Sequence, residues 1–526
     1  MPRLFIDDRE VEVQNGATIL DAAGKLGIEI PTMCFLKGYE PSTSCMACVV
    51  KVEGRPYLIP ACGAPAEDGM RVKSDCQEVL QARKAAVELL LSDHLGDCMG
   101  PCHVICPAQM NIPLMIRQIA AGQLRDAIVT VKRDIALPAV LGRICPAPCE
   151  RGCRRAAVDE SGEAVSIRLL KRYVADVDLQ SARPYLPACK PPQNKRVAIV
   201  GAGPAGLAAA YYLQQTGAAC TIFDDHEKPG GMLQYGVPES ELPRDVLDQE
   251  IALIEKLGVD FQCQTRIGAA LSLEDLRKDF DAVFVATGAA ASPPGDGLGL
   301  KTSPNGIAID ADTYQTDLSG VFAGGDAVRK RRLTVRAVAD GKEAAVPISQ
   351  YLAGETVTGP TKVFNTRIGK ARDDEKQAFA ACASGARRVT PQQDTGFTDE
   401  QARQETTRCL HCDCRKAENC RLRECAQQYV ARPTRYKGDR RSFVQRVQHP
   451  EVIYEPGKCI DCGLCIQIAA AAAEELGLAF VGRGFDVRVE VPFGRSIAEA
   501  LKRCAAECAT ACPTGALATR DLRFDK

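Results

Sequence analysis

The amino-acid sequence predicts a multidomain protein that combines α+β and α/β parts. Its 526 residues exceed what a single hydrophobic core usually organises. Hydrophobic residues (46%) and charged residues (25%) occur at the frequencies of an ordinary globular protein. The spacing of apolar residues changes along the chain, from strand-like alternation to helical periodicity and then to alternating strands and helices. We expect a small α+β domain (1–75), a helical domain (76–190), an α/β domain (195–358), a linker (359–400), a cysteine-rich segment (401–445) and a second small domain (446–526).

The charge balance argues against two classes of partner. Lys and Arg total 66 and Asp and Glu total 67, so no global field attracts nucleic acid or an anionic membrane. The first residues, MPRLFIDDREVEV, lack the apolar core of a secretory signal. No stretch approaches the roughly 20 apolar residues that cross a bilayer. We therefore expect a cytoplasmic chain without a membrane span and without a nucleic-acid partner.

Cysteine is the unusual component, with 26 residues. In a reducing compartment disulfides are rare, so many cysteines indicate metal ligands rather than bridges. Most of them lie in four groups, at 34–76, 98–153, 409–425 and 459–512. Dense grouping of this kind is typical of metal sites.

The first group lies in the α+β segment, where strand-like runs such as LFIDDREVEV flank a turn at Asn15-Gly16 and a short helical run. Its spacing is C-x10-C-x2-C-x13-C. One C-x2-C pair with two single cysteines suits the four thiolates of a two-iron cluster, whereas zinc, the alternative, usually uses two such pairs. The spacing predicts a [2Fe-2S] cluster on Cys34, Cys45, Cys48 and Cys62.

With this pattern, residues 1–93 resemble the N-terminal domain shared by the large iron-sulfur subunit of complex I and by iron-only hydrogenases. The resemblance implies a β-grasp ferredoxin-like fold. The complex I subunit also has a motif of one histidine and three cysteines, and the stretch SDHLGDC, from Ser92 to Cys98, is similar to it.

The helical segment holds seven candidate ligands. One tetranuclear cluster takes four, so two clusters with interleaved ligands are expected. The stretch C-x3-C-P followed by RICPAPCERGC resembles the helical domain of the glutamate synthase small subunit and of dihydropyrimidine dehydrogenase. The resemblance implies one [4Fe-4S] cluster on Cys98, Cys102 and Cys153 and another on Cys106, Cys145 and Cys149.

Each of these two sets has three cysteines and needs a fourth ligand. His94 is the candidate for the first, and the alternative is that it caps a helix. In the second, the family has Glu or Gln where this chain has Lys171, and a protonated amine is a poor ligand. Glu160 and Glu163 are alternatives, so this ligand stays open.

The α/β segment begins with the strand VAIV, a G-x-G-x-x-G loop and a helix, followed by a second strand that ends at Asp224. Such glycines let a dinucleotide pyrophosphate approach the helix N-terminus, and the acid accepts hydrogen bonds from the ribose. The segments PGGMLQYGVP, ATG and GVFAGGDA join this loop. Together they resemble the FAD half of the glutamate synthase small-subunit family. An alternative is a degenerate fold without cofactor.

That resemblance implies a set of FAD-binding residues around the glycine loop, the flavin and the ribityl chain. They are Gly201, Gly203, Pro204, Ala205, Gly206, Asp224, Gly231, Met232, Leu233, Thr287, Gly288, Gly325, Asp326 and Thr334. In the family a second dinucleotide-binding domain, for NADPH, is inserted between ATG and GGD. Here only residues 289–324 separate these motifs, too few for such a domain. We expect no NAD(P)H site.

Two cysteine sets follow. The stretch RCLHCDCRKAENC offers a [4Fe-4S] cluster or, as the alternative, zinc, on Cys409, Cys412, Cys414 and Cys420. The run C-x2-C-x2-C with a distant Cys-Pro is a ferredoxin pattern and predicts a [4Fe-4S] cluster on Cys459, Cys462, Cys465 and Cys512. A second ferredoxin cluster is not expected, because Ala469, Lys502 and Ala505 occupy its ligand positions.

These features favour an electron-transfer subunit of a multi-subunit oxidoreductase, with FAD, one [2Fe-2S] cluster and about four [4Fe-4S] clusters. The expected partners are dehydrogenase, hydrogenase or diaphorase-type subunits, or ferredoxin, and flavin-based bifurcation is compatible with the motifs. One alternative is a self-contained FAD enzyme acting on a small substrate or on ferredoxin. Another is a redox-sensing or structural scaffold of clusters and zinc. The sequence identifies no catalytic residue, donor or acceptor.

Overall fold

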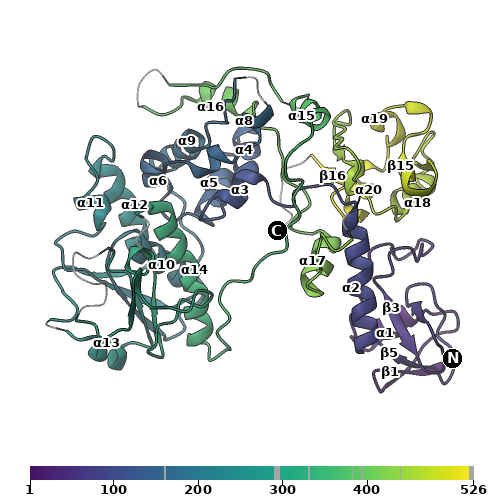
Figure 1. Cartoon of the computed structure of the whole chain (residues 1–526), viewed down its shortest axis with the longest axis horizontal. Coiled ribbons are helices and arrows are strands. Elements are labelled where there is room, and N and C mark those ends of the chain that lie inside the picture. Colours follow the sequence, from purple (N-terminus) through teal and green to yellow (C-terminus); the bar gives the residue numbers. More distant parts are fainter. Residues whose placement is uncertain are drawn as a thin grey trace. The chain divides into compact units, whose positions relative to one another are not determined.

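The computed structural model describes residues 1–158, 161–269, 271–289, 297–329, 332–381, 383–391, 395–436, 438 and 440–520. The chain forms two compact units (Figure 1). Unit 1 comprises residues 1–100, 363–382 and 412–526, and unit 2 comprises residues 101–362 and 383–411. Each unit therefore combines segments that lie far apart in the sequence, which the periodicity alone does not predict.

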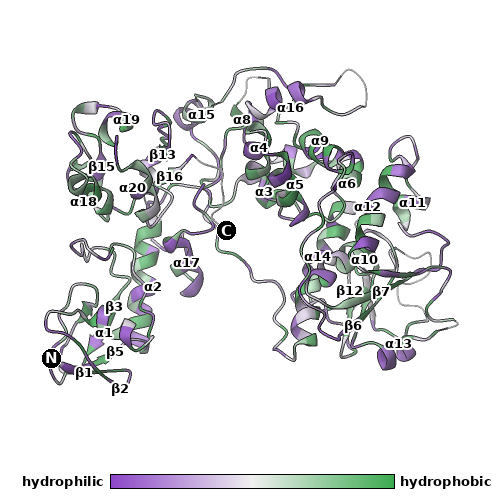
Figure 2. Cartoon of the chain, turned by 180° about the vertical axis from the view of Figure 1, so that it is seen from behind, coloured by the Kyte–Doolittle hydropathy of each residue, from purple (hydrophilic) through white to green (hydrophobic). Residues whose placement is uncertain are grey.

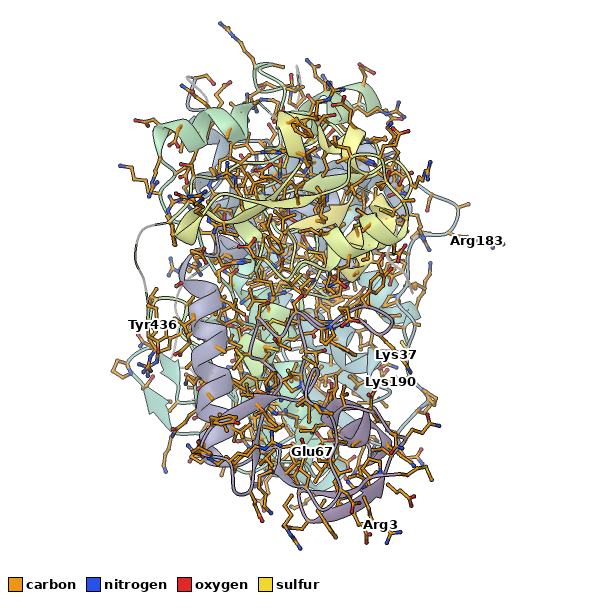
Figure 3. All side chains as sticks on the ribbon, turned by 90° about the vertical axis from the view of Figure 1, so that its right-hand side faces the viewer. Arg3, Lys37, Glu67, Arg183, Lys190 and Tyr436 are labelled. Carbon is orange, nitrogen blue, oxygen red and sulfur yellow. The ribbon has the colours of Figure 1, made fainter. Side chains whose placement is uncertain are left out.

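Unit 1 begins with a mixed sheet in the order β2-β1-β5-β3-β4. The alternation in LFIDDREVEV places Leu4 and Ile6 in the core, beneath a helix that begins at a capping box of Thr18 and Asp21. Arg3 and Glu67 lie on the outside of this domain (Figure 3). The elements are β1 (Arg3–Ile6), β2 (Arg9–Glu12), α1 (Ile19–Lys25), β3 (Val49–Val52), β4 (Leu58–Pro60), β5 (Arg71–Lys73) and the long helix α2 (Gln77–Ser92).

The C-terminal part of unit 1 is a second small domain. An antiparallel pair, β13 (Val452–Tyr454) and β16 (Leu517–Thr519), packs with α18 (Leu464–Ala471) and α20 (Ala505–Ala511) in one hydrophobic cluster. The other elements of unit 1 are α15 (Asp373–Ala380), α17 (Arg421–Gln428), η2 (Pro456–Lys458), β14 (Ala479–Val481), η3 (Gly484–Asp486), β15 (Arg488–Glu490), η4 (Pro492–Gly494) and α19 (Ile497–Ala500).

Unit 2 has a helical part, as the sequence predicts. Its helices are α3 (Pro101–Ile105), α4 (Ile112–Ala120), α5 (Leu124–Lys132), α6 (Pro138–Ile144), α7 (Pro148–Arg151), α8 (Arg155–Val158), α9 (Ile167–Leu179) and α16 (Asp399–Thr406). The free N–H groups of Ala139 and Val140, at the start of α6, donate to the buried carboxylate of Glu250, which comes from α12 (Arg244–Lys256). This contact joins the helical part to the α/β part.

The α/β part is a parallel sheet in the order β12-β9-β6-β7-β8, the order of a doubly wound dinucleotide-binding fold. The strands β6, β9 and β12 are hydrophobic and almost entirely buried, as expected for a parallel sheet covered on both faces, and Figure 2 colours the sheet by hydropathy. The elements are β6 (Arg196–Val200), α10 (Pro204–Gln215), β7 (Ala219–Phe223), α11 (Met232–Tyr235), β8 (Asp260–Gln262), α13 (Leu273–Asp279), β9 (Ala282–Val285), β12 (Val321–Ala323), η1 (Gly325–Ala327) and α14 (Thr334–Leu352).

Between β9 and β12 the described residues 297–320 form only turns and a small hairpin, β10 (Thr302–Ser303) with β11 (Gly306–Ile307). This segment has no helix in its described part and holds no second dinucleotide-binding fold there. The combination of mixed α+β and parallel α/β parts confirms the predicted fold class. In the part of the chain that the structure describes, none of the helices has the length and apolarity that crossing a membrane requires.

Candidate flavin and iron-sulfur sites

The four cysteines of the first predicted set lie at one buried place in unit 1. Cys48 and Cys62 have their Sγ atoms 3.3 Å apart. Hydrogen bonds from Cys45 and then Cys62 lower the pKa of the Cys34 thiol, so these three side chains are in contact. Met46, with φ 53°, takes a left-handed conformation that turns the loop between the second and third cysteines. This loop and the segment after β4, which carries Cys62, together bring four thiols to one place, the number that a two-iron cluster needs.

Cys106, Cys145 and Cys149 line one cavity of about 340 Å³ in unit 2. The loop between the last two passes through Ala147, whose φ of 49° lets the chain turn before Pro148 begins α7. Apolar side chains, Ile112 and Ile135 among them, form most of the remaining wall, to which Arg168 and Lys171 also contribute. Burial raises the pKa values of Cys106 and Cys149, and the charge of Lys171 opposes that rise at both thiols.

Lys171 lines the same cavity and is buried, with 5% of its surface exposed. Glu163 is engaged elsewhere, because its carboxylate accepts a hydrogen bond from the backbone of Arg388 at 3.3 Å. Glu160 lies outside the described residues. The structure thus places buried Lys171, and not Glu163, in the cavity of Cys106, Cys145 and Cys149, where the cluster would need its fourth ligand.

Replacing Lys171 with methionine is expected to leave the iron bound and to lower the midpoint potential of the cluster at Cys106, Cys145 and Cys149. A positive charge at roughly 6 Å in an effective dielectric of about 20 stabilises the added electron by on the order of 100 mV. Redox titration followed by EPR measures this shift. Lys502→Met, which alters an exposed ion pair with Glu475, is the control and should leave the potential unchanged. Loss of about four irons would instead make the Lys171 amine a ligand.

Cys459, Cys462, Cys465 and Cys512 line a second cavity, of about 360 Å³, in unit 1. Gly463, with φ 73°, provides the left-handed turn that lets the first three cysteines face one point. Backbone N–H groups of Asp461 and Leu517 point at the Cys459 and Cys512 sulfurs, at 3.4 and 3.5 Å. Such hydrogen bonds to sulfur raise the potential of a cluster. The ferredoxin pattern in the sequence therefore corresponds to one enclosed site.

The two remaining predicted sets each draw on both units. His94 and Cys98 belong to unit 1, whereas Cys102 and Cys153 belong to unit 2. Likewise Cys409 belongs to unit 2, and Cys412, Cys414 and Cys420 belong to unit 1. Within unit 2, Cys102, Cys153 and Cys409 contact the same hydrophobic core. These two sets remain predictions.

The predicted dinucleotide site forms around the N-terminus of α10 in unit 2. Gly206 has no room for a side chain, because a Cβ there would lie 1.9 Å from the Gly201 carbonyl oxygen. Gly231 and Gly325 also lie close to the loop. A Cβ built on Gly231 would lie 2.9 Å from Cα of Gly203, and a Cβ built on Gly325 would lie 2.9 Å from Cβ of Ala205. Glycine is required at these contacts, so three separate motifs of the sequence converge on one site.

Of the other predicted FAD residues, Asp224 and Thr287 lie beside this loop, since a Cβ built on Gly201 would lie 3.3 Å from Cα of Thr287. Asp224 follows β7 and accepts a hydrogen bond from the Ala202 N–H at 2.6 Å, which fixes its carboxylate beside the loop. Thr287 and Gly288 follow β9, and Thr334 is the first residue of α14. Leu233 is buried in the core, whereas its neighbour Met232 is 69% exposed, so the two face different environments.

Sequence reasoning missed Asp340, which anchors the GGD motif. This residue of α14 is 1% exposed, and its Oδ2 accepts the N–H of Gly325 at 3.1 Å. Its Oδ1 accepts hydrogen bonds from Tyr314 and Arg336. The sequence did contain a sign of this role: Asp340 lies among apolar residues of α14, and a carboxylate buried there needs hydrogen-bond partners.

Comparisons with known proteins agree with this layout. Residues 2–77 match the 2Fe-2S iron-sulfur cluster binding domain, and residues 77–183 match the 4Fe-4S cluster domain II of dihydropyrimidine dehydrogenase. Residues 199–251 match the NAD(P)-binding Rossmann-like domain, and residues 237–341 match the pyridine nucleotide-disulphide oxidoreductase family. The chain therefore consists, over these regions, of the cluster and flavin-type domains of an oxidoreductase component.

Curated relatives point to the same group. The beta subunit of NADPH-Fe(3+) oxidoreductase from Geobacter sulfurreducens is 45% identical over 198 residues, 37% of this chain and 29% of the relative. The beta subunit of NADP(+)-dependent formate dehydrogenase from Moorella thermoacetica is 41% identical over 214 residues, 37% of this chain and 30% of the relative. The PreT subunit of NAD-dependent dihydropyrimidine dehydrogenase from Salmonella typhimurium is 38% identical over 219 residues, 41% of this chain and 51% of the relative.

The chain thus spans about half the length of these relatives or less. Over the matched regions it is homologous to FAD-iron-sulfur proteins of the glutamate synthase small-subunit, PreT and formate dehydrogenase beta type. The resemblance drawn from the motifs is confirmed.

Proposed function

We propose that this chain relays electrons between partner subunits of a larger oxidoreductase, through FAD and iron-sulfur clusters. One observation carries the proposal. The cavity of Cys106, Cys145 and Cys149 is lined by Val335, the neighbour of Thr334, which the motifs assign to the flavin. Because α14 contributes to both places, the flavin and this cluster would be near neighbours inside unit 2.

The α14 helix is also tied to the helical part by charge. Lys342 of α14 donates a hydrogen bond to the Ala108 carbonyl at 3.1 Å and pairs with Asp134 at 2.5 Å. Ala108 lies two residues beyond Cys106, so the flavin-side helix and the cluster loop are held together. FAD would supply two-electron chemistry, and the clusters would accept single electrons. The protein's part is to position these groups and to exclude water from the apolar cavity.

The short segment between β9 and β12 supports a chain without its own NAD(P)H site. Its described residues provide turns and a hairpin in place of a second dinucleotide-binding fold. Electrons would therefore enter or leave through a partner subunit. The relatives named as subunits of NADPH-Fe(3+) oxidoreductase and of formate dehydrogenase are compatible with such an assembly.

Anaerobic reduction of the purified full chain tests the proposal. Photoreduction should bleach flavin and clusters together, because electrons pass between them. NADH and NADPH should not bleach the isolated chain, whereas co-purified partner subunits should restore reduction by NAD(P)H, formate or hydrogen. Rapid reduction of the isolated chain by NADPH would overturn the relay and favour a self-contained flavin enzyme. Bleaching of flavin without clusters would favour a structural role for the metal sites.

A further inference from the structure

Two segments far apart in the sequence lie side by side in unit 1. Asp97 and Asp413 form a parallel β-bridge, and the Cys414 N–H donates to the Cys98 carbonyl at 3.3 Å. A third segment covers Cys98, whose Sγ lies 3.3 Å from the hydroxyl of Thr366. Cys98 is therefore buried between backbone segments and directly beside Cys414.

Cys420 belongs to the same place. Two turns, in which Ala417 bonds back to Cys414 and Asn419 to Lys416, fold the chain between Cys414 and Cys420. Cys420 is buried, with 6% of its surface exposed. The two turns therefore bring the chain from Cys414 to Cys420 within one buried part of unit 1.

His94 lies at the start of the same loop, four residues before Cys98. Its side chain is half-buried, and its buried Nδ1 atom has no hydrogen-bond partner among the described residues. An imidazole nitrogen buried without a partner is costly unless a ligand satisfies it. The backbone beside His94 is held by the next residue, Leu95, whose N–H donates to the Gly457 carbonyl at 2.7 Å.

Lys458 lies beside both the Cys414 side chain and the loop that follows His94. A Cβ built on Gly515 would lie 2.2 Å from the Cys414 sulfur and 3.6 Å from Cδ of Lys458, so these two side chains meet at that glycine. A Cβ on Gly96 would lie 2.6 Å from Cε of Lys458, which places the loop after His94 against the same lysine.

We propose that His94, Cys98, Cys414 and Cys420 bind one [4Fe-4S] cluster in unit 1. This set differs from both sets that the sequence predicts for these residues. It deepens the proposed function, and it rests on the proposal that the chain binds clusters. Cys102 and Cys153 are then left, together with Cys409 on the same hydrophobic core, for a separate site in unit 2.

One histidine and three cysteines also suit zinc. Around one zinc ion, bonds of about 2.0–2.3 Å would bring the ligand atoms within roughly 4 Å of each other. Among the described residues, the only group of three candidate ligand atoms within 4.8 Å of one another is Asp224, Asp225 and His226. No three ligand atoms of His94, Cys98, Cys414 and Cys420 lie that close together, which favours a cluster of four irons over one zinc ion.

Paired substitutions distinguish the proposed set from the predicted ones. In the full chain, Cys98→Ser and Cys414→Ser should each remove about four irons, and the double variant should also remove about four. Cys98→Ser combined with Cys102→Ser should remove about eight, because two clusters are lost. Iron, acid-labile sulfide and zinc are measured per chain. Cys425→Ser, a buried cysteine of α17 outside the set, is the matched control and should keep all iron.

The reverse pattern would overturn the proposal. In that case the Cys98→Ser, Cys414→Ser double variant would lose about eight irons, and the Cys98→Ser, Cys102→Ser double variant would lose about four. Unchanged iron in Cys414→Ser, or loss of zinc there, would overturn it as well. His94→Cys gives a second test that does not depend on tolerance of cluster loss, since it should keep the iron and shift one EPR signal. An unchanged EPR spectrum would exclude His94. These counts are independent of turnover, so this proposal and the electron relay can fail separately.

Discussion

Replacing Arg408 with leucine is expected to destabilise unit 2 by about 3–5 kcal/mol, the cost of leaving one charge of a buried pair without its partner. The side chains of Arg408 and Glu405 are both 0% exposed, and Nη1 of the arginine lies 2.9 Å from Oε1 of the glutamate. The same guanidinium donates to the carbonyls of Ala164, Glu163 and Ala386, which would also lose their donors.

Urea unfolding of the full chain, followed by release of flavin fluorescence, measures this loss. Arg495→Leu is the control, because Arg495 and Glu499 form an exposed ion pair, with 62% and 41% of the side chains accessible. Removing that pair should cost less than about 1 kcal/mol. Equal stabilities for the two variants would show that the buried pair does not hold segment 383–411 in place.

The second large effect concerns the flavin. Gly203→Ala should weaken flavin binding at least ~100-fold, about 2.7 kcal/mol, while the fold stays intact. The backbone at Gly203 has φ −75°, which alanine adopts freely, and no atom of the described residues lies within 4 Å of a built Cβ. The added methyl group would instead occupy the space in which a pyrophosphate approaches the loop.

Flavin per chain, measured from the absorbance of the released cofactor, reports this effect, and circular dichroism reports the fold. Gly24→Ala is the matched control, because that glycine of α1 also has no atom within 4 Å of a built Cβ. Gly206→Ala would be uninformative, because its methyl group would strike the Gly201 carbonyl and disturb the fold itself. Full flavin content in Gly203→Ala would place the cofactor elsewhere.

Local patterns were sufficient to predict much of the fold and of the sites. The strand, glycine loop and helix at 196–215 form as expected, because each residue's role there depends on close neighbours in the chain. The same holds for the C-x2-C-x2-C run at 459–465, whose cysteines line one cavity. Short-range spacing determines such geometry.

Long-range pairing could not be predicted from spacing. Cys98 lies four residues from Cys102 but contacts Cys414, because Asp97 and Asp413 pair across more than 300 residues. Asp340 and Arg408 gain their roles from partners that only the folded chain brings to them. Spacing along the sequence assigns each cysteine to a cluster with its near neighbours in the chain, whereas in the folded protein cysteines from distant segments lie together.

The interleaving of the two units has a consequence for how the protein is made. One hydrophobic cluster of unit 1 joins Cys34 and Val87 to Leu422 and Leu464, which are translated more than 300 residues later. Domains generally fold as they emerge, N-terminal first, but this core has to wait until unit 2 has been synthesised. The loop around Cys34 thus stays incomplete on the ribosome, and iron delivered to a nascent chain would meet a binding site that residues made much later have not yet enclosed.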